Sequence, residues 1–153
     1  MKNYMKLEIA SISENESFAR SAVAAFALSL NPSLTELSDI KTAVSEAVTN
    51  CIVHAYKGAR TLENKIFIEC RAEEDGNGGF LHIEITDFGC GIENLDEAMQ
   101  PFFTTLSLED RAGMGFTIMQ AFTNEFFAKS KLGEGTTVSM TKRIGEGEGN
   151  GNA

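Results

Sequence analysis

The chain has 153 residues, a length that suits one domain with a sizeable core. Its formal net charge of -9 at pH 7 argues against nonspecific binding to nucleic acid or to an anionic membrane, and suits a basic protein partner better. No apolar run is long enough to span a bilayer and no signal peptide is recognisable, so we expect a cytoplasmic protein. The three cysteines form no CxxC pair, which favours reduced thiols over a zinc site or a disulfide framework.

The first expected elements are a strand and a helix. Apolar and polar residues alternate over residues 5–11, which is the period of a half-buried strand. Ser13 followed by Glu16 has the spacing of a capping box and predicts a helix from there to about Leu30. The residues expected to form the buried stripe of this helix are Phe18, Ala22, Ala25, Phe26 and Leu30.

A second helix is expected to follow, with Pro32 near its first position, and to run to about Tyr56. Its apolar stripe, which can be buried, consists of Ile40, Val44, Ala47, Val48, Cys51 and Ala55. Glu46, Asn50 and His54 lie four residues apart on the opposite stripe. A carboxylate one turn from an amide could hold a proton acceptor beside a metal-bound phosphate. Alone, however, a polar stripe is usually only a solvated helix face.

The second half of the chain is expected to complete a sheet. Strands are predicted over residues 65–72, 80–87, 126–131 and 136–143, with a helix over 113–122. Residues 88–112 are expected to form a long loop with one short helical piece, and a loop of this length is typical of a functional lid or a disordered segment. This order predicts an α/β two-layer sandwich, a mixed sheet covered on one face by helices, as a single domain over residues 1–144. The Gly- and Glu-rich residues 145–153 are expected to be a disordered tail.

A carboxylate followed by glycines ends the strand expected over residues 80–87. Asp87 can accept a hydrogen bond from the exocyclic amine of adenine, and Gly89 and Gly91 allow a ligand to lie against bare backbone. The alternative interpretation is an ordinary Asp-Gly turn. Neither a Walker A motif nor a GxGxxG after a strand is present, so any nucleotide site must be built differently.

A second glycine segment contains Arg111, Gly113 and Gly115 and immediately precedes the expected helix. Free backbone N–H groups and the helix dipole would then point at a phosphate, with Arg111 as an additional charge-assisted donor. The alternative interpretation is a helix start that is merely softened by glycine.

Four segments in this order resemble the Bergerat-fold ATP-binding family and, more closely, the anti-sigma-F factors of spore-forming Firmicutes. They are residues 15–20 (NESFAR), 45–50 (SEAVTN), 101–105 (PFFTT) and 113–119 (GMGFTIM). The resemblance covers about residues 1–143 and implies a mixed, mostly antiparallel sheet covered on one face by helices. It further implies a homodimeric protein-serine kinase that sequesters a sporulation sigma factor and phosphorylates an anti-anti-sigma protein.

The resemblance also implies roles for residues in an ATP or ADP site. Glu46 would be the general base for the attacking serine, and Asn50 would coordinate a Mg²⁺ ion that bridges the ATP phosphates. His54, two turns from Glu46, is interpreted as structural. The implied adenine pocket consists of Asp87, Gly89, Gly91 and Thr137, the last acting through water.

The implied phosphate-binding residues are Thr104, Thr105, Arg111, Gly113, Met114 and Gly115. Thr104 and Thr105 would lie at the lid hinge, where they contact phosphate or only order the loop. Leu106 follows them where relatives commonly have a lysine, which shifts the electrostatic role of the lid to Arg111 and puts the kinase rate in doubt.

Glu16 and Arg20 match the partner-binding surface of the family, although both also fit an exposed helix face. The alternatives are a nucleotide-gated sigma trap with little turnover and a stress-response anti-sigma kinase of the same group. A sensor histidine kinase fragment is disfavoured because no phosphoacceptor helix pair precedes the ATP motifs.

Overall fold

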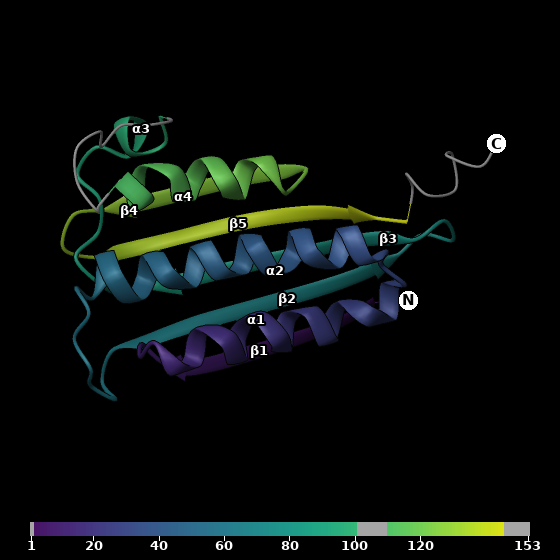
Figure 1. Ribbon diagram of the computed structural model, residues 1–153, viewed down its shortest axis with the longest axis horizontal. Helices are drawn as coiled ribbons and strands as arrows, with labels where there is room; N and C mark the ends of the chain where they lie inside the picture. Colours follow the sequence, from purple (N-terminus) through teal and green to yellow (C-terminus); the bar gives the residue numbers. More distant parts are fainter. Residues whose placement is uncertain (1, 101–109, 146–153) are drawn as a thin grey trace.

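The computed structural model is a five-stranded sheet with helices on one face (Figure 1). It describes residues 2–100 and 110–145, and for residues 110–113 it describes the backbone only. The elements in chain order are β1 (Lys2–Ala10), α1 (Glu14–Ala27), the 3₁₀-helix η1 (Leu28–Leu30), α2 (Leu34–Thr49), the π-helix η2 (Asn50–Ala55), β2 (Lys65–Glu74), β3 (Gly79–Asp87), α3 (Leu95–Ala98), α4 (Asp110–Ala121), β4 (Glu125–Lys131) and β5 (Gly135–Ile144). The predicted tail beyond residue 145 and the segment 101–109 lie outside the described residues.

The strands of the sheet lie in the order β1-β2-β3-β5-β4, and every described neighbouring pair is antiparallel. The expectation of a mixed sheet is therefore wrong in this respect. Two helices, α1 and α2, connect β1 to β2, and a chain that crosses the sheet twice enters the next strand in the opposite direction. The pairs β2–β3 and β4–β5 are hairpins, which are antiparallel by construction.

The core lies between the sheet and the helices α1, α2 and α4, which run across one face (Figure 1). The predicted alternation is confirmed in the two central strands, where Ile66, Ile68 and Cys70 of β2 and Leu81, Ile83 and Ile85 of β3 are buried. The predicted apolar stripe of α2 is also buried at Ile40, Val44, Ala47, Val48 and Cys51. A sheet that is packed on one face requires this period of two.

The buried stripe of α1 differs from the prediction by about one position, although the predicted Leu30, which lies in η1, is buried. Its buried residues are Ala19, Val23, Ala24 and Ala27, whereas Phe18 is 53% exposed. The prediction placed the large phenylalanines inside because burial of a large apolar side chain is favourable. Instead, α1 turns Ala19, Val23, Ala24 and Ala27 inward and packs directly against α2, whereas Ala25 is exposed.

The capping box belongs to the second helix and not to the first. Ser33 accepts from the Glu36 N–H at 3.0 Å, and the Glu36 carboxylate accepts from the Ser33 N–H at 2.8 Å. Ser13 has helical dihedral angles and makes no side-chain cap. Pro32 consequently precedes the N-cap, where its fixed φ fits an extended entry.

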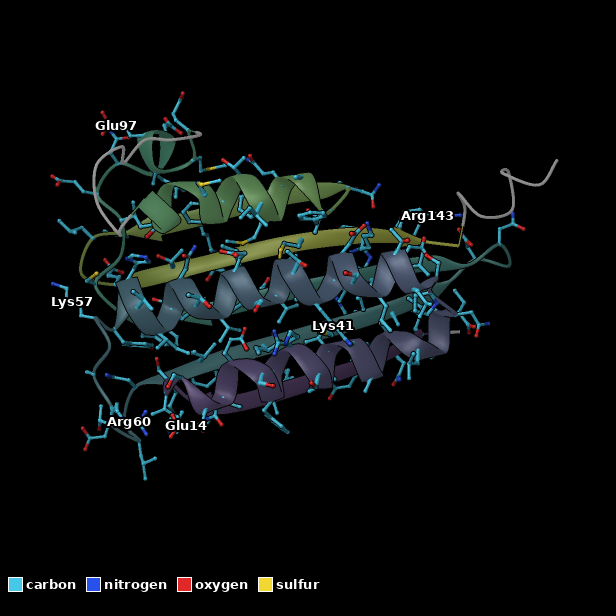
Figure 2. All side chains as sticks on the ribbon, in the orientation of Figure 1. Glu14, Lys41, Lys57, Arg60, Glu97 and Arg143 are labelled. Carbon is cyan, nitrogen blue, oxygen red and sulfur yellow. The ribbon has the colours of Figure 1, made fainter. Side chains whose placement is uncertain are left out.

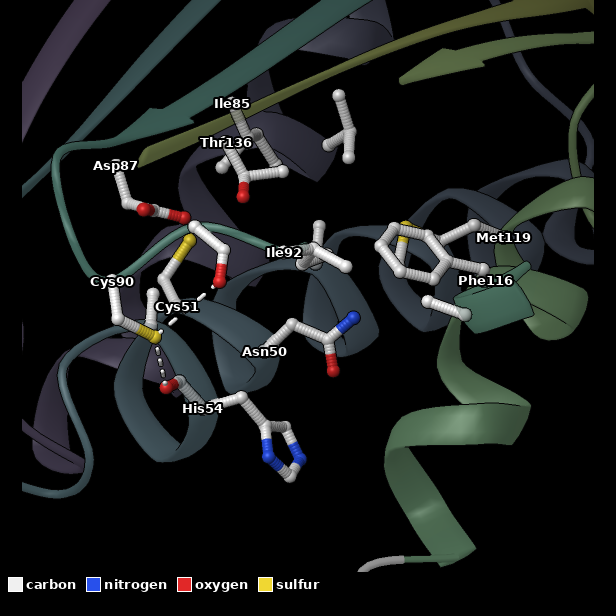
Figure 3. Close-up of a pocket in the computed structure, with 15 residues that line it drawn as sticks. Asn50, Cys51, His54, Ile85, Asp87, Cys90, Ile92, Phe116, Met119 and Thr136 are labelled. Atoms are coloured by element: carbon white, nitrogen blue, oxygen red, sulfur yellow. Dashed lines mark hydrogen bonds between the residues drawn. The ribbon is translucent and has the colours of Figure 1, made fainter. Parts of the chain in front are cut away.

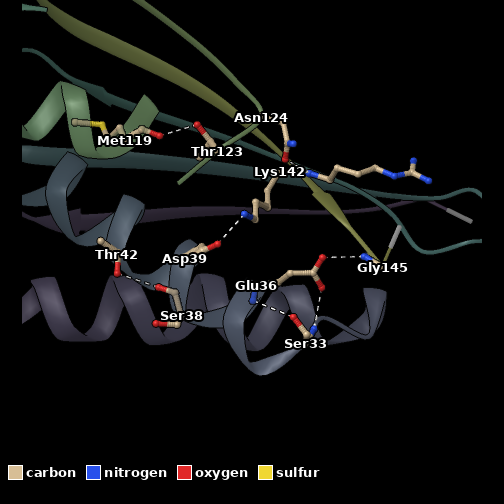
Figure 4. Close-up of polar contacts among 11 residues, drawn as sticks. Ser33, Glu36, Ser38, Asp39, Thr42, Met119, Thr123, Asn124, Lys142 and Gly145 are labelled. Atoms are coloured by element: carbon tan, nitrogen blue, oxygen red, sulfur yellow. Dashed lines mark hydrogen bonds and ion pairs between the residues drawn. The ribbon is translucent and has the colours of Figure 1, made fainter. Parts of the chain in front are cut away.

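Polar contacts attach the end of β5 to α2 (Figure 4). The Lys142 ammonium lies 3.0 Å from a carboxylate oxygen of Asp39, and the Gly145 N–H donates to Glu36 at 3.0 Å. At the far end of the molecule, Arg60 pairs with Glu14 at 2.7 Å beside the start of α1 (Figure 2). Across residues 2–100 and 110–145, none of the helices has both the length and the apolar character needed to cross a membrane.

Candidate nucleotide-binding site

A cavity of about 210 Å³ lies between the helix layer and one end of the sheet (Figure 3). Its wall is mostly apolar, with Ala47, Ile85, Ile92, Phe116, Met119 and Val138 among the lining residues. The polar side chains that also line it include Asn50, His54, Asp87 and Thr136. An apolar cavity with a few converging polar groups is the usual form of a small-molecule site, and a flat aromatic base fits such a wall.

The cavity opens beside the π-helix at the end of α2. Asn50, Cys51, His54 and Ala55 all belong to this π-helix, and all four line the cavity. A π-helix has a wider turn than an α-helix and occurs frequently at functional sites. Asn50 and His54, which were predicted to share one helix stripe, both line the cavity. Glu46 is half-buried one turn earlier and is not among the described lining residues.

Asp87 supplies a buried carboxyl group at the end of β3. It is 4% exposed, and its carboxylate accepts from the Gly89 N–H at 2.9 Å. Burial raises the pKa of Asp87 above its usual value, and hydrogen bonds from Gly89, Cys51 and Thr136 oppose that rise. Burial, followed by the nearby Asp87 charge, raises the pKa of the Cys51 thiol well above its usual range, so Cys51 stays neutral.

The two glycines after Asp87 are required by close backbone packing. A Cβ on Gly89 would lie 2.4 Å from the Ala55 carbonyl oxygen, so a side chain there would separate the loop from η2. Gly91 has φ +72°, and a Cβ there would lie 2.1 Å from the Lys131 carbonyl oxygen. Between them, the Cys90 N–H donates to Ala55 at 3.0 Å. The loop is thus held between η2 and the β4–β5 hairpin.

The second glycine segment does not precede a helix but lies inside one. Helix α4 includes Asp110, so Gly113 and Gly115 are helical positions. The predicted helix over 113–122 began at Gly113, whereas the observed helix begins at Asp110, so the glycines lie in its first turns and not before it. A Cβ on Gly115 would lie 3.0 Å from Nδ2 and 3.1 Å from Oδ1 of Asn50. The missing side chain therefore lets the α4 backbone approach the Asn50 amide.

Comparison with known proteins identifies the family to which this chain belongs. Residues 10–142 match the model of the histidine kinase-like ATPase domain. The chain is 56% identical over 144 residues to an anti-sigma F factor of Caldanaerobacter subterraneus subsp. tengcongensis, covering 94% of this chain and 95% of the relative. It is 55% identical to that of Thermoanaerobacter sp. (strain X514), with the same coverage. The chain belongs to the anti-sigma F factor family.

The resemblance found in the sequence is thus confirmed, and the ATPase domain implies that this member of the anti-sigma F factor family binds a nucleotide. The fold is also similar to the crystal structure of the RsbU and RsbW domains of a Mycobacterium tuberculosis protein, with a TM-score of 0.61. That likeness has 16% sequence identity and covers 93% of this chain and 32% of the other, so it supports the fold alone.

One predicted site residue, Thr137, lies on the face of the sheet that points away from the cavity. Thr136 pairs with Asp87 across β3 and β5 and lines the cavity, whereas Thr137 pairs with Thr86. The Thr137 and Thr86 hydroxyl groups lie 3.1 Å apart on the opposite face. The alternation in β5, where Val138 and Met140 are buried, would have selected Thr136 from the sequence.

The remaining predicted residues are only partly described. Thr104 and Thr105 lie outside the described residues, as does the side chain of Arg111. Met114 lies on α4 with 38% of its surface exposed.

Glu16 and Arg20 lie on α1, outside the cavity lining. They form an ion pair at 3.5 Å, and the same Glu16 oxygen accepts from the Ser45 hydroxyl. They therefore lie at the contact between α1 and α2, and Ser45, the partner of Glu16 on α2, directly precedes Glu46 in the sequence.

Proposed function

We propose that this protein is an ATP-dependent protein-serine kinase that also binds and inhibits a sporulation sigma factor. The observation that carries the proposal is one cavity with a buried carboxyl group, Asp87, and with Asn50 one helical turn after Glu46. A nucleotide needs a group that recognises its base at one end and a group near its phosphates at the other. In this proposal Asp87 recognises the base and the Asn50 amide lies near the phosphates.

Adenine binding is assigned to Asp87 and Thr136. The Asp87 carboxylate would accept from the exocyclic amine, and the Thr136 hydroxyl, on the paired strand, would support the same edge of the base. The apolar wall would contact both faces of the ring. A guanine presents a carbonyl oxygen where adenine has its amine, and so it would be repelled by the carboxylate.

Magnesium binding is assigned to Asn50. A Mg²⁺ ion in a nucleotide site is usually held by one or two protein ligands together with phosphates and water, so an amide oxygen suffices. This fits the described residues, which contain no cluster of three or more His, Cys, Asp or Glu side chains able to hold a metal. The ion, when bound, would neutralise charge on the ATP phosphates.

Glu46 is assigned as the general base. Its carboxylate would take the proton of the substrate serine hydroxyl as the serine oxygen attacks the γ-phosphorus, and ADP would leave with its bond to that phosphorus broken. The half-buried position one turn before Asn50 supports this role, because base and metal ligand then lie on the same side of α2.

The partners are assigned by analogy with the relatives, which are anti-sigma F factors. We infer that the chain acts in the cytoplasm as a homodimer that binds a sigma factor and phosphorylates an anti-anti-sigma protein. Glu16 and Arg20 at the α1–α2 contact would belong to this partner surface. The same name favours a sporulation role over the stress-response alternative.

Phosphate transfer to a candidate anti-anti-sigma protein, detected by intact mass with Mg-ATP, tests the kinase. We expect transfer by the wild type and at least a hundredfold slower transfer by Glu46→Ala with nearly unchanged ATP affinity, because a positioned base contributes about 10²–10⁴ in rate. Comparable transfer by the variant would refute the role of Glu46. ATP binding with no transfer by the wild type would instead support a nucleotide-gated sigma trap.

A further inference from the structure

Tyr56 links three segments that build one end of the cavity. It follows η2 directly, and its hydroxyl group donates to the Lys65 carbonyl at 2.7 Å. The same hydroxyl accepts from the Phe88 N–H at 2.8 Å. Lys65 begins β2 and Phe88 follows the last residue of β3, so one side chain joins the end of the helix to both strands.

The Tyr56 hydroxyl group lies where the backbone pairing between β2 and β3 stops. The last pair of that ladder is Ile66 with Asp87, and the next pair in the same register would be Lys65 with Phe88. Their backbone groups bond to the Tyr56 hydroxyl instead of to each other. Tyr56 therefore takes the place of one further pair of the ladder and lets the chain leave the sheet immediately after Asp87.

The departure from the sheet shapes the turn that holds the Asp87 carboxyl group. Beyond Phe88, the Gly89 N–H donates to Asp87 and the Cys90 N–H donates to Ala55. Ala55 and Tyr56 are consecutive, so the end of η2 holds this loop at two adjacent points. On the other side of the loop, the Phe88 ring packs edge-on against Phe67 with centroids 5.6 Å apart.

We propose that Tyr56 is a positioning residue that sets the Asp87 carboxyl group for adenine and thereby determines base selectivity. This rests on the proposed adenine-reading role of Asp87. Without the hydroxyl group, Lys65 and Phe88 can pair directly, which extends the ladder and moves the turn after Asp87. A preorganised acceptor discriminates between bases only while its position is fixed, so selectivity for adenine decreases when the turn moves.

Tyr56→Phe tests the proposal because it removes the hydroxyl group and keeps the ring. We expect ATP to bind about fivefold more weakly, the effect of roughly one net hydrogen bond, with GTP binding changed less than twofold. The KM for ATP rises, and kcat at saturating ATP stays close to the wild-type value. Binding is measured by calorimetry at a temperature where circular dichroism shows that each variant is folded.

The matched control is Tyr4→Phe, which changes the other of the two tyrosines in the chain, 65% exposed on the edge strand β1. It should leave both nucleotide affinities unchanged. An ATP-to-GTP preference that stays within twofold of the wild type in Tyr56→Phe overturns the positioning role, even if the variant is less stable. A wild type that binds GTP as tightly as ATP overturns the role of Asp87 itself, so the two failures are distinguishable.

Hydrogen exchange in the wild-type protein tests the positioning role of Tyr56 without depending on whether the Tyr56→Phe variant folds. If Tyr56 fixes the turn in advance, the Phe88 and Cys90 amides are protected from hydrogen exchange before nucleotide is added. Free exchange of both amides in the nucleotide-free wild type would overturn the proposal, because the turn would then be ordered by the ligand and not by the hydroxyl group.

Discussion

Asp87 combines an ionisable group with a buried position. Because burial raises its pKa in the folded protein above the value in the unfolded chain, the folded state binds this proton more readily. The contribution of this carboxyl group to stability is therefore fully present below the unfolded pKa, and it is lost as the pH rises through the raised pKa. Ionisation of this buried carboxyl group therefore costs stability in the folded protein, which is expected of a ligand-binding group.

Asp87→Asn should separate these two effects. Since the amide has no proton to lose, we expect the thermal midpoint at pH 7 to rise, and the difference from the wild type to vanish below about pH 4, where both side chains are neutral. ATP affinity should fall at least tenfold, because an amide replaces the charged acceptor. Calorimetric unfolding across pH and titration with ATP measure both quantities, and wild-type affinity in the variant would contradict the assignment.

Among single residues, the sequence predicted which residues belong to the site better than it predicted which face of a strand each side chain occupies. Asn50, Asp87 and Gly91 line the cavity as expected, since each was placed by a motif with a clear position on its element. Thr136 was missed in favour of Thr137 because the choice depended on which face of β5 meets the helices. The roles of all these residues stay predictions.

Among the elements, the start of α2 depends on a complete capping box. Ser33→Ala removes the acceptor for the Glu36 N–H, and we expect the free energy of unfolding to fall by about 1 kcal/mol. Ser13→Ala is the matched control, because Ser13 precedes α1 without capping it, and its effect should be within about 0.5 kcal/mol. Urea unfolding measures both variants, and equal losses would contradict the assignment of the cap to α2.

Helices and strands were predictable where one period dominated the sequence. The central strands alternate strictly, and α2 has an uninterrupted apolar stripe, so both were found. The inward face of α1 was not, because alanines can be buried or exposed with little penalty and the choice depends on how closely α1 packs on its neighbours. Helix α4 begins at Asp110, three residues before the predicted helix over 113–122, and it packs against α2.

For the molecule as a whole, one ion pair links the two layers. Lys142 of β5 and Asp39 of α2 lie 3.0 Å apart, with side chains only 12% and 22% exposed. We expect Lys142→Met to lower the free energy of unfolding by about 2 kcal/mol, because Asp39 would keep a poorly solvated charge.

The double variant Asp39→Leu/Lys142→Met is the control for that change. It should recover part of the loss, since no unpaired charge remains. Denaturant unfolding of the single and double variants completes the cycle. Additive losses would show that the two side chains do not interact.

The two-layer arrangement was predictable from the order of the elements, whereas the fully antiparallel sheet required counting the helices that connect β1 and β2. The cavity was the hardest feature to predict. It joins residues as distant in sequence as Ala47 and Val138, and no local pattern encodes that proximity.

That long-range assembly would bring a bound nucleotide into contact with both layers of the molecule. An occupant would touch α2, β3, α4 and β5 simultaneously, so it would add contacts among elements that already pack against one another. A ligand present at a hundred times its Kd adds about 2.7 kcal/mol to the stability of the protein that binds it. Resistance to proteolysis and the lifetime of this protein in the cell would therefore follow the supply of nucleotide, and energy depletion would act on its abundance as well as on its activity.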